Sequence, residues 1–386
     1  MDQFDVLYER MGTGSIRWDR AKAKFGTDKE LLPLWIADTD FRAPEEVVEA
    51  LRRRADHGIF GYTFAMPEYL ESVARWYRRR HGLEARAEWI APTYGVVTAL
   101  YFTIRELTRP GDKVMIMTPA YEPFFAIISN LDRQIAELEL SYHDNTYTID
   151  FDAMERMFRE GVRLLLFCNP HNPVGRVWKR EELEQVARLC SRYGVYLASD
   201  EIHGDVALFG NRYISMASFE QVRELVAVYT SAGKGFSMTG LHTSNMIIPD
   251  PKLRDRIAET LRGAWIMSPN LFGLEATRVA YEQCEYWLDE EIAYLEGNSR
   301  FVTDFLAKEL PEVTAAEHEA TYLMWLDFHR LGLSDEELVR RMTEVCRLGL
   351  GVGSHYGAQF GQFLRLNIGC PRQLLEKAMK ALCAIR

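Results

Sequence analysis

The sequence predicts an α/β fold with a large domain, built on a mainly parallel sheet covered by helices, and a smaller α+β domain. Between about residues 86 and 248, short apolar runs alternate with segments of helical apolar spacing, as in sheets made of βαβ units. After about residue 295 the pattern changes to a smaller set of strands and helices. A chain of 386 residues is long enough to bury both cores.

The larger part contains five apolar runs that predict buried strands. Two of them are separated by "REELEQVARLCSRY", whose apolar residues have helical spacing, and Gly194 follows this segment as a stop signal. This order predicts a βαβ unit. The five runs are "KVMIMTP", "RLLLFCN", "VYLASDE", "LVAVYTS" and "SNMIIP".

The smaller part begins with "TYLMWLDF", which predicts a strand. Ser334 and Glu337 have the spacing of a capping box that opens a helix. The run "FLRLNIG" predicts another strand, and a last helix is expected from about Arg372. Because no low-complexity linker separates the two parts, we expect them to share a broad interface.

Composition excludes several classes of function. The formal net charge of −10 argues against a broad nucleic-acid-binding face. The N-terminus is charged and no apolar run approaches about 20 residues, so we expect a cytoplasmic protein with no membrane partner. The six cysteines form no C-x-x-C pair and the nine histidines no H-x-x-x-H pair, which predicts neither disulfides nor a metal site.

Lys234 has an unusual setting in "VAVYTSAGKGFSMTG", between two glycines just past an apolar strand. At the end of a buried strand its amine would lie inside the protein, where desolvation lowers the pKa of the ammonium group. A neutral lysine amine is a nucleophile toward carbonyls. This stretch alone fits a lysine in an ordinary glycine turn equally well.

Polar residues end three of the predicted strands, namely Asn169, Asp200 and Ser231. Ligands of open α/β sheets bind at the carboxyl ends of the strands, so these residues and Lys234 are expected at one crevice. Asp200 would be buried and would need a cation or a protonated ring nitrogen. Taken alone, it is more often a helix N-cap or a surface acid.

Three further residues fit a planar, phosphorylated ligand. Asn172, in the turn-rich loop "NPHNPVG", has an amide that could donate into the crevice, although a plain turn asparagine is the commoner case. Gly95 precedes a predicted helix from Val96 to Leu107, whose free amides suit a phosphate. Tyr121 follows a strand and could stack on a ring, although such aromatics are more often core residues.

Together these groups suit one cofactor, pyridoxal 5'-phosphate. The ordered segments "YGVVTAL", "TPAYEPF", "NPHNPVGRVW", "SDEIHGD", "TSAGKGFSMTGL" and "FLRLNIGCPR" resemble the fold-type I pyridoxal phosphate enzymes, aminotransferase class I/II. With "WIADTDF" and "HGIFGY", the chain is most similar to the cystathionine β-lyase-like C-S lyases, over essentially its whole length. The resemblance implies a seven-stranded-type sheet in a cofactor-binding domain over residues 45–290, with residues 1–44 and 291–386 forming the small domain.

The resemblance also implies roles for the catalytic residues. Lys234 would bind the cofactor as a Schiff base, Asp200 would pair with the pyridinium, and Tyr121 would stack on the ring. Asn172 would bond the ring oxygen. Arg365 would bind the substrate α-carboxylate as a bidentate fork.

For the phosphate, the resemblance implies Ser231 and the amides of Val96 and Val97 after Gly95. It also implies a two-fold homodimer in which Tyr62 reaches the phosphate of the neighbouring subunit.

The chain departs from the aminotransferase pattern at several positions. His203, near the expected ring oxygen, replaces the tyrosine usual in aminotransferases, whereas the lyase-like group commonly has histidine there. His242 stands where aminotransferases usually place a phosphate-binding arginine, and Val96 and Val97 lack the hydroxyls common in the phosphate loop.

The sequence therefore favours a β-elimination lyase that cleaves cystathionine or other S-substituted L-cysteines to a thiol, pyruvate and ammonia. An aminotransferase of class I/II is the first alternative, because it shares the early steps. A regulatory or interaction protein on the same scaffold is the second, although such a surface does not require Lys234, Asp200 and Arg365 together.

Overall fold

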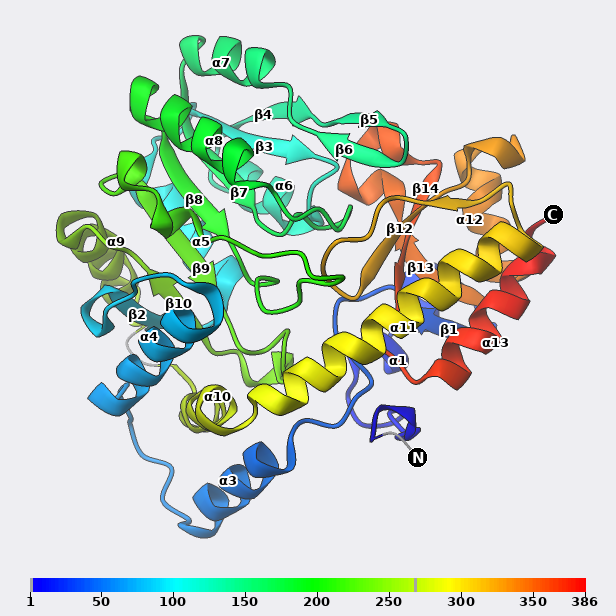
Figure 1. Ribbon diagram of the computed structural model, residues 1–386, viewed down its shortest axis with the longest axis horizontal. Coiled ribbons are helices and arrows are strands. Elements are labelled where there is room, and N and C mark those ends of the chain that lie inside the picture. The colour runs from blue at the N-terminus through cyan, green and yellow to red at the C-terminus, as the bar shows by residue number, and fades with distance from the viewer. Residues whose placement is uncertain (1–2, 267–268) are drawn as a thin grey trace.

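The structure is a computed structural model that describes residues 3–266 and 269–386. A seven-stranded sheet forms the centre of the larger part of the molecule (Figure 1). The strands lie in the order β2-β10-β9-β8-β7-β3-β4. The last five are parallel to one another, and β10 runs antiparallel to both of its neighbours. The strands are β2 (Ile90–Thr93), β3 (Lys113–Thr118), β4 (Gln134–Glu139), β7 (Val162–Cys168), β8 (Tyr196–Asp200), β9 (Val226–Thr230) and β10 (Ser244–Ile247).

All five strands predicted for this part are confirmed, and so is the βαβ unit. The connecting helix α8 spans Arg180–Tyr193, and Gly194 ends it in the left-handed region at φ 63°. In the register of the sheet, Cys168 lies opposite Asp200, and Asp200 lies opposite Tyr229. The carboxyl ends of β7, β8 and β9 are therefore level at one edge of the sheet.

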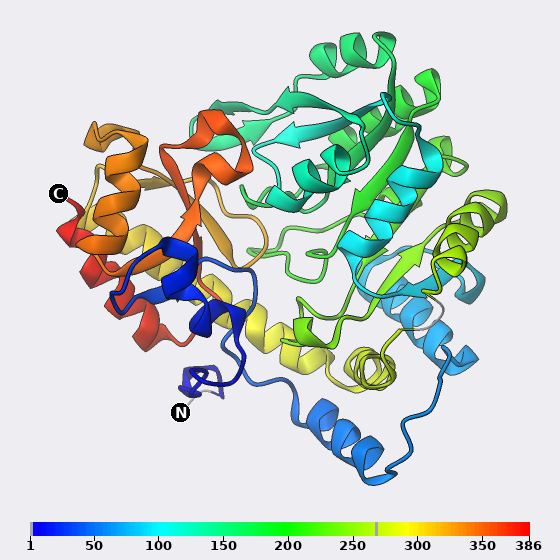
Figure 2. The same cartoon turned by 180° about the vertical axis from the view of Figure 1, so that it is seen from behind.

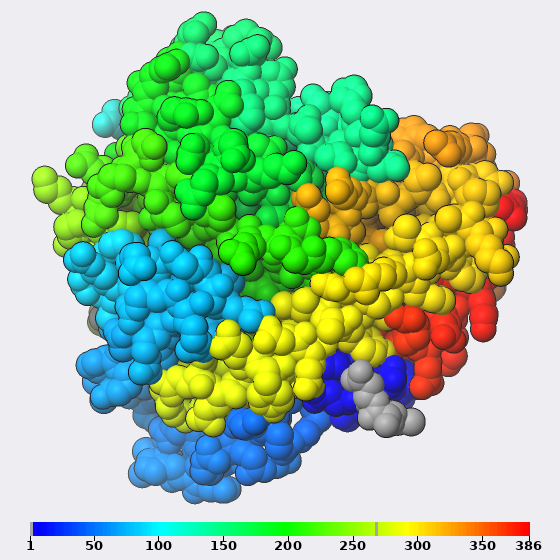
Figure 3. Space-filling view, viewed as in Figure 1, coloured from blue at the N-terminus to red at the C-terminus, as the bar shows by residue number. Residues whose placement is uncertain are grey.

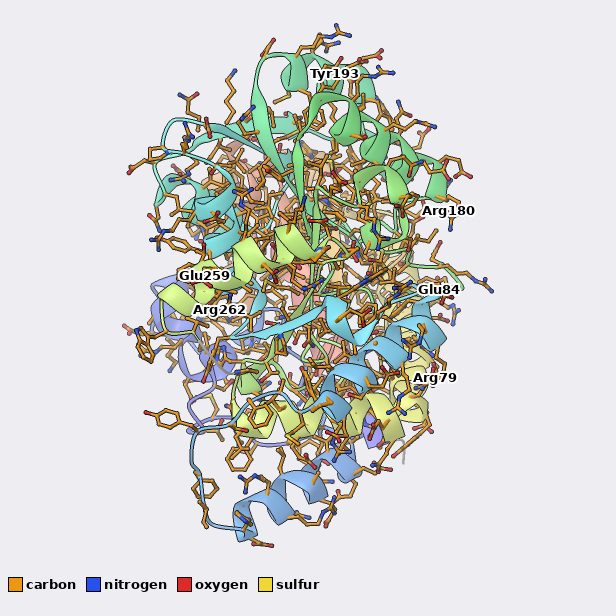
Figure 4. All side chains as sticks on the ribbon, turned by 90° about the vertical axis from the view of Figure 1, so that its left-hand side faces the viewer. Arg79, Glu84, Arg180, Tyr193, Glu259 and Arg262 are labelled. Atoms are coloured by element: carbon orange, nitrogen blue, oxygen red, sulfur yellow. The ribbon has the colours of Figure 1, made fainter. Side chains whose placement is uncertain are left out.

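Helices cover both faces of this sheet, because its central strands β3, β7, β8 and β9 are buried on both sides. One core contains Leu164 and Leu166 of β7, and the other contains Leu165 and Phe167. The helices α5 (Val96–Leu107), α6 (Glu122–Ser129) and α9 (Pro251–Gly263) pack on the first face, and α4 (Pro67–His81), α7 (Phe151–Arg159), α8 and α10 (Leu271–Gln283) on the second. In Figure 4, Arg180, Glu259 and Arg262 point outward from these helices into solvent.

A second sheet joins the two ends of the chain. Its strands lie in the order β1-β13-β14-β12-β11, with β1 parallel to β13 and the other pairs antiparallel. Figure 2 shows the N-terminal segment against the C-terminal elements. The strands are β1 (Leu32–Leu34), β11 (Thr314–Ala315), β12 (Leu323–Asp327), β13 (Leu348–Val352) and β14 (Phe363–Asn367).

The helix α12 (Asp335–Glu344) has only half of the predicted capping box. Ser334 accepts a hydrogen bond from the amide of Glu337 at 3.2 Å. The carboxylate of Glu337 instead accepts from Arg340 and Arg341, which compete with the N-cap amide. The last helix, α13 (Arg372–Leu382), begins where the sequence predicts it.

The long helix α11 (Glu285–Glu309) runs across the molecule from the larger part to the smaller one (Figure 3). The division into residues 45–290 and residues 1–44 with 291–386 stays a proposal, and its second boundary falls inside α11. The remaining elements are α1 (Ile16–Asp19), α2 (Ala21–Phe25), α3 (Glu45–Asp56) and the hairpin of β5 (Ser141–His143) and β6 (Thr146–Thr148). Among the described helices, none has the length and apolar character to cross a membrane.

Candidate active site

A cavity of about 330 Å³ lies at the carboxyl ends of β7, β8 and β9. Nine of the predicted site residues line it, and His242 lines it as well. Asp200 and Ser231 therefore face one crevice as expected, but Asn169 does not line this cavity, because its amide is turned to the carbonyl of Ile214 at 2.8 Å. The nine are Gly95, Val96, Val97, Tyr121, Asn172, Asp200, His203, Ser231 and Lys234.

Lys234 lies in the turn after β9, and its Nζ donates a hydrogen bond to the carbonyl of Ala37. Burial lowers its pKa to about 8, and the charges of Asp38, Arg365 and Asp200 have smaller effects. The direction of this shift is the one the sequence predicts. A substantial fraction of the amine is therefore neutral near pH 7.5.

The glycines beside Lys234 are required by close packing rather than by a left-handed turn. A Cβ on Gly233 would lie 3.1 Å from the Oγ of Ser231, and one on Gly235 would lie 3.0 Å from the Cβ of Asp205. Neither glycine has a positive φ. The turn therefore packs closely against Ser231 and Asp205, and this packing places Lys234 at the cavity.

Asp200 ends β8 and is 4% exposed. Its Oδ1 accepts a hydrogen bond from the amide of Ile202 at 3.2 Å. Burial raises its pKa to about 7, and the hydrogen bond from Ile202 and the nearby Lys234 only partly offset this effect. A buried carboxylate with so little compensation fits a site for a cationic ring nitrogen.

Asn172 and Arg365 are directly linked by a hydrogen bond, although Asn172 lies in the loop after β7 and Arg365 lies on a strand of the other sheet. The guanidinium of Arg365, on β14, donates to the Oδ1 of Asn172 at 2.9 Å and to the carbonyl of Trp35 at 2.8 Å. This contact leaves the amide NH₂ of Asn172 available as a donor. The Nε of Arg365 is buried and has no hydrogen-bond partner among the described residues.

His203 is 3% exposed, and its Nδ1 has no hydrogen-bond partner within the described part of the chain. Burial lowers its pKa well below the usual range, and the positive charges of Lys234 and Arg365 lower it further. The imidazole is therefore neutral near pH 7 and can either donate or accept one hydrogen bond in the cavity.

Tyr121 is the N-cap residue of α6, and its half-buried ring lines the cavity. Burial raises the pKa of its hydroxyl, so the phenol stays protonated near pH 7. It offers an aromatic face and a polar end to a ligand.

An anion site lies at the start of α5. Gly95 is its N-cap with φ 88°, a conformation that favours glycine, and no side chain caps the helix. The amides at this end therefore suit a phosphate group. Ser231 is partly committed, because its hydroxyl donates to the carbonyl of Thr243 at 2.7 Å and accepts from the amide of Gly233 at 3.0 Å.

Sequence reasoning missed several hydroxyl groups beside this anion site. They could replace the hydroxyls that Val96 and Val97 lack. The cluster of hydroxyl residues after Lys234 in "SMTGLHTS" was the available signal. The missed hydroxyl residues are Tyr94, Thr98, Thr239, Thr243 and Ser244.

These features fit pyridoxal 5'-phosphate. An uncompensated carboxylate, an unpartnered imidazole nitrogen and a free helix N-terminus surround one lysine of lowered pKa. Few other ligands need a pyridinium partner, an anion site and an amine in a cavity of this size.

A second cavity, of about 690 Å³, continues from the first. Both contain Ala37, Tyr121, Lys234 and His242, and the second adds Arg365. Much of its wall comes from the N-terminal segment, including residues 36–41 of "WIADTDF". A substrate held by Arg365 would lie between this wall and Lys234.

Tyr62 is not part of either cavity. It is fully exposed, on the segment that joins α3 to α4 (Figure 1). The structure thus does not bring this predicted site residue to the site of its own chain.

Comparisons with known proteins agree with the resemblance predicted from the sequence. The family model for aminotransferase class I and II matches residues 29–382. Cystathionine beta-lyase PatB of Bacillus subtilis (strain 168) is 39% identical over 383 residues, which cover 99% of both chains. Protein MalY of Escherichia coli (strain K12) is 32% identical over 99% of this chain and 98% of its own.

Solved structures give the same result. Cystalysin from Treponema denticola, whose structure contains pyridoxal 5'-phosphate, is 34% identical with a TM-score of 0.96, and the match covers 100% of this chain and 98% of that one. A pyridoxal phosphate-bound C-S lyase from Staphylococcus hominis is 30% identical with a TM-score of 0.92, over 99% and 97% of the two chains.

Proposed function

The chain belongs to the aminotransferase class I and II family, and we propose that it is a pyridoxal phosphate-dependent carbon-sulfur β-lyase. It cleaves cystathionine or other S-substituted L-cysteines to a thiol, pyruvate and ammonia. One observation carries this proposal: Lys234 and Asp200 line the same cavity, and Arg365 lines the cavity that continues from it. The chain is also similar to C-S lyases over its full length.

Seven groups would hold the cofactor. Asp200 would pair with its ring nitrogen, Tyr121 would cover the ring, and Asn172 and His203 would face the ring oxygen. The amides of Val96 and Val97 would bind the phosphate, and a rotated Ser231 hydroxyl would add to them. When bound, pyridoxal 5'-phosphate supplies the electron sink that stabilises negative charge at the substrate Cα.

Arg365 and Lys234 act on the substrate itself. Arg365 binds the α-carboxylate and fixes the orientation of the amino acid. The neutral Nζ of Lys234 takes the Cα proton as a general base, because its lowered pKa is close to the working pH. The electron pair left at Cα forms a double bond to Cβ while the bond from Cβ to sulfur breaks, and the thiolate departs with the electron pair of that bond. Water then hydrolyses the released unsaturated amine to pyruvate and ammonia.

Transamination is the competing reaction. It begins with removal of the same Cα proton but returns that proton to the cofactor, and no bond to sulfur breaks. Purified protein should convert L-cystathionine to pyruvate, ammonia and homocysteine with no keto acid present, and Lys234→Ala should abolish this activity. Formation of keto acid products only after an acceptor keto acid is added would instead identify an aminotransferase.

We also propose a two-fold homodimer in which Tyr62 reaches the phosphate of the neighbouring site. Large apolar side chains are exposed together on the same segment, which supports a partner surface there. Their exposed fractions are 67% for Ile59, 60% for Phe60, 112% for Tyr62 and 66% for Phe64. A cytoplasmic location is proposed as well, since all six cysteines, which lie in the described residues, are free thiols.

A further inference from the structure

We propose that Asp38 and Arg10 recognise the far end of the substrate, the ammonium and carboxylate groups carried on its thiol arm. The assignment rests on the proposed lyase function and narrows its substrate class. It names S-substituted cysteines whose sulfur bears a zwitterionic or singly charged arm, rather than a plain alkyl group.

The cavity provides room for such an arm. Lys234 and Arg365 line the 690 Å³ cavity together with Arg10 and Asp38. A sulfur substituent of a cysteine held by Arg365 and facing Lys234 would extend toward the N-terminal wall. The pKa of Lys234 is set mainly by burial. Among the charged groups that also shift this pKa, Asp38 has the largest effect, which indicates that its carboxylate lies near the Lys234 amine.

Asp38 and Arg10 belong to a cluster of two arginines and two aspartates with no net charge. Arg17 and Asp40 have side chains 0% and 4% exposed, whereas Arg10 and Asp38 are each 25% exposed. Arg17 and Asp40 are thus buried beneath Arg10 and Asp38. Arg10 and Asp38 present one positive and one negative group to the cavity.

The contacts leave bonding capacity on both groups. Arg10 donates to the Oδ2 of Asp38 at 3.0 Å, to Asp40 at 2.7 Å and to the carbonyl of Thr39 at 3.0 Å. The Oδ1 of Asp38 is buried 3.5 Å from Arg17, so a ligand in the cavity would contact the other oxygen, Oδ2, which accepts from Arg10. A carboxylate oxygen accepts about two hydrogen bonds and a guanidinium donates five, so Oδ2 and Arg10 can each add a substrate contact.

Complementary charges favour a zwitterion over a neutral arm. The amino group at the far end of cystathionine matches Asp38, and its carboxylate matches Arg10. Arg42 also lines the cavity but is paired with Glu45 on the outside, so it is not assigned a contact.

The test compares kcat/KM for pyruvate release from L-cystathionine, S-(2-aminoethyl)-L-cysteine, S-(2-carboxyethyl)-L-cysteine and S-ethyl-L-cysteine. The wild-type protein should prefer each charged substrate over the ethyl compound by about tenfold. Asp38→Asn should remove the preference for the aminoethyl arm, and Arg10→Gln the preference for the carboxyethyl arm. Each kcat/KM is divided by the value for S-ethyl-L-cysteine with the same protein. A substitution that alters the reactivity of Lys234 or the cofactor content affects both values equally and leaves this ratio unchanged.

Glu155→Gln is the matched control. Glu155 is also paired with two arginines, Arg159 at 3.1 Å and Arg192 at 3.0 Å, and its side chain is 23% exposed, but it lies on α7 away from both cavities. Its ratios should equal those of the wild type.

If the wild-type protein had equal kcat/KM for the charged substrates and for S-ethyl-L-cysteine, the assignment would be overturned. This comparison of substrates needs no variant protein. Ratios that stay within about twofold of wild type in folded Asp38→Asn and Arg10→Gln proteins would overturn it too. If none of the four compounds released pyruvate without a keto acid, the lyase function itself would be refuted, and the assignment with it.

Discussion

Replacing Asp200 with asparagine should stabilise the cofactor-free protein and at the same time nearly abolish turnover. The carboxylate is 4% exposed, and burial raises its pKa to about 7. Asparagine has the same size and keeps an oxygen for the amide of Ile202, but it brings no charge into the core. The two effects have opposite signs because the charge is unfavourable without the cofactor and required with it.

The stability effect follows from the two pKa values. The difference between about 7 in the folded chain and 3.8 for a solvated carboxyl corresponds to about 4 kcal/mol. Because the folded value is the higher one, Asp200 and its asparagine variant should be equally stable below about pH 4. The wild type then loses stability as the pH rises toward 7. At pH 8.5 the Asp200→Asn protein should unfold about 5 °C higher.

The activity effect is larger. Loss of the buried partner of the ring nitrogen costs roughly 3 to 5 kcal/mol, and if most of it appears in the barrier, turnover falls by about two to four powers of ten. Pyruvate release from L-cystathionine measures the activity, and thermal unfolding of cofactor-free protein at pH 4.5 and 8.5 measures the stability. Glu155→Gln on α7 serves as a control that should change both only slightly.

Two results would refute this reasoning. An Asp200→Asn protein that kept more than about a tenth of wild-type turnover would show that Asp200 does not contact the ring nitrogen. A cofactor-free variant that was less stable than wild type at pH 8.5 would show that the carboxylate is compensated by groups other than those described here.

Three more predictions concern Lys234, Arg365 and Tyr62. Borohydride should fix the cofactor onto Lys234, which peptide mapping would locate, and cofactor uptake should accelerate as the pH rises through about 8, since only the neutral amine reacts; label on another lysine would contradict the site. Arg365→Ala should raise KM by about 10- to 100-fold through loss of the carboxylate contact, and an unchanged KM would exclude that role. Mixing inactive Tyr62→Ala and Lys234→Ala chains should restore about a quarter of wild-type activity if the site is shared across a two-fold dimer, whereas no recovery after subunit exchange would argue against a shared site.

Local sequence signals predicted the strands and the cavity residues that follow them. Runs such as "VYLASDE" end in a polar residue, and parallel strands place such ends at the same edge of a sheet. Asp200 and Lys234 could therefore be assigned to the site from the sequence. The lowered pKa of Lys234 followed from its expected burial alone.

Features that depend on distant chain contacts could not be predicted in this way. Arg365 was placed at the site by resemblance only, and its link to Asn172 joins a strand of the second sheet to the loop after β7. The charged wall of Arg10 and Asp38 exists because β1 pairs with β13, which brings the N-terminal segment over the cavity. The hydroxyl of Ser231 was predicted to face a phosphate, yet its proton is used locally by Thr243.

The number of pyruvate molecules formed per chain, with S-ethyl-L-cysteine or L-cystathionine and no keto acid, tests the central claim most directly. A lyase regenerates its cofactor in every cycle, so pyruvate should far exceed the number of chains and should match ammonia one to one. If product formation stopped at about one keto acid per chain and resumed only on addition of an acceptor keto acid, the protein would be an aminotransferase and the lyase account would be wrong.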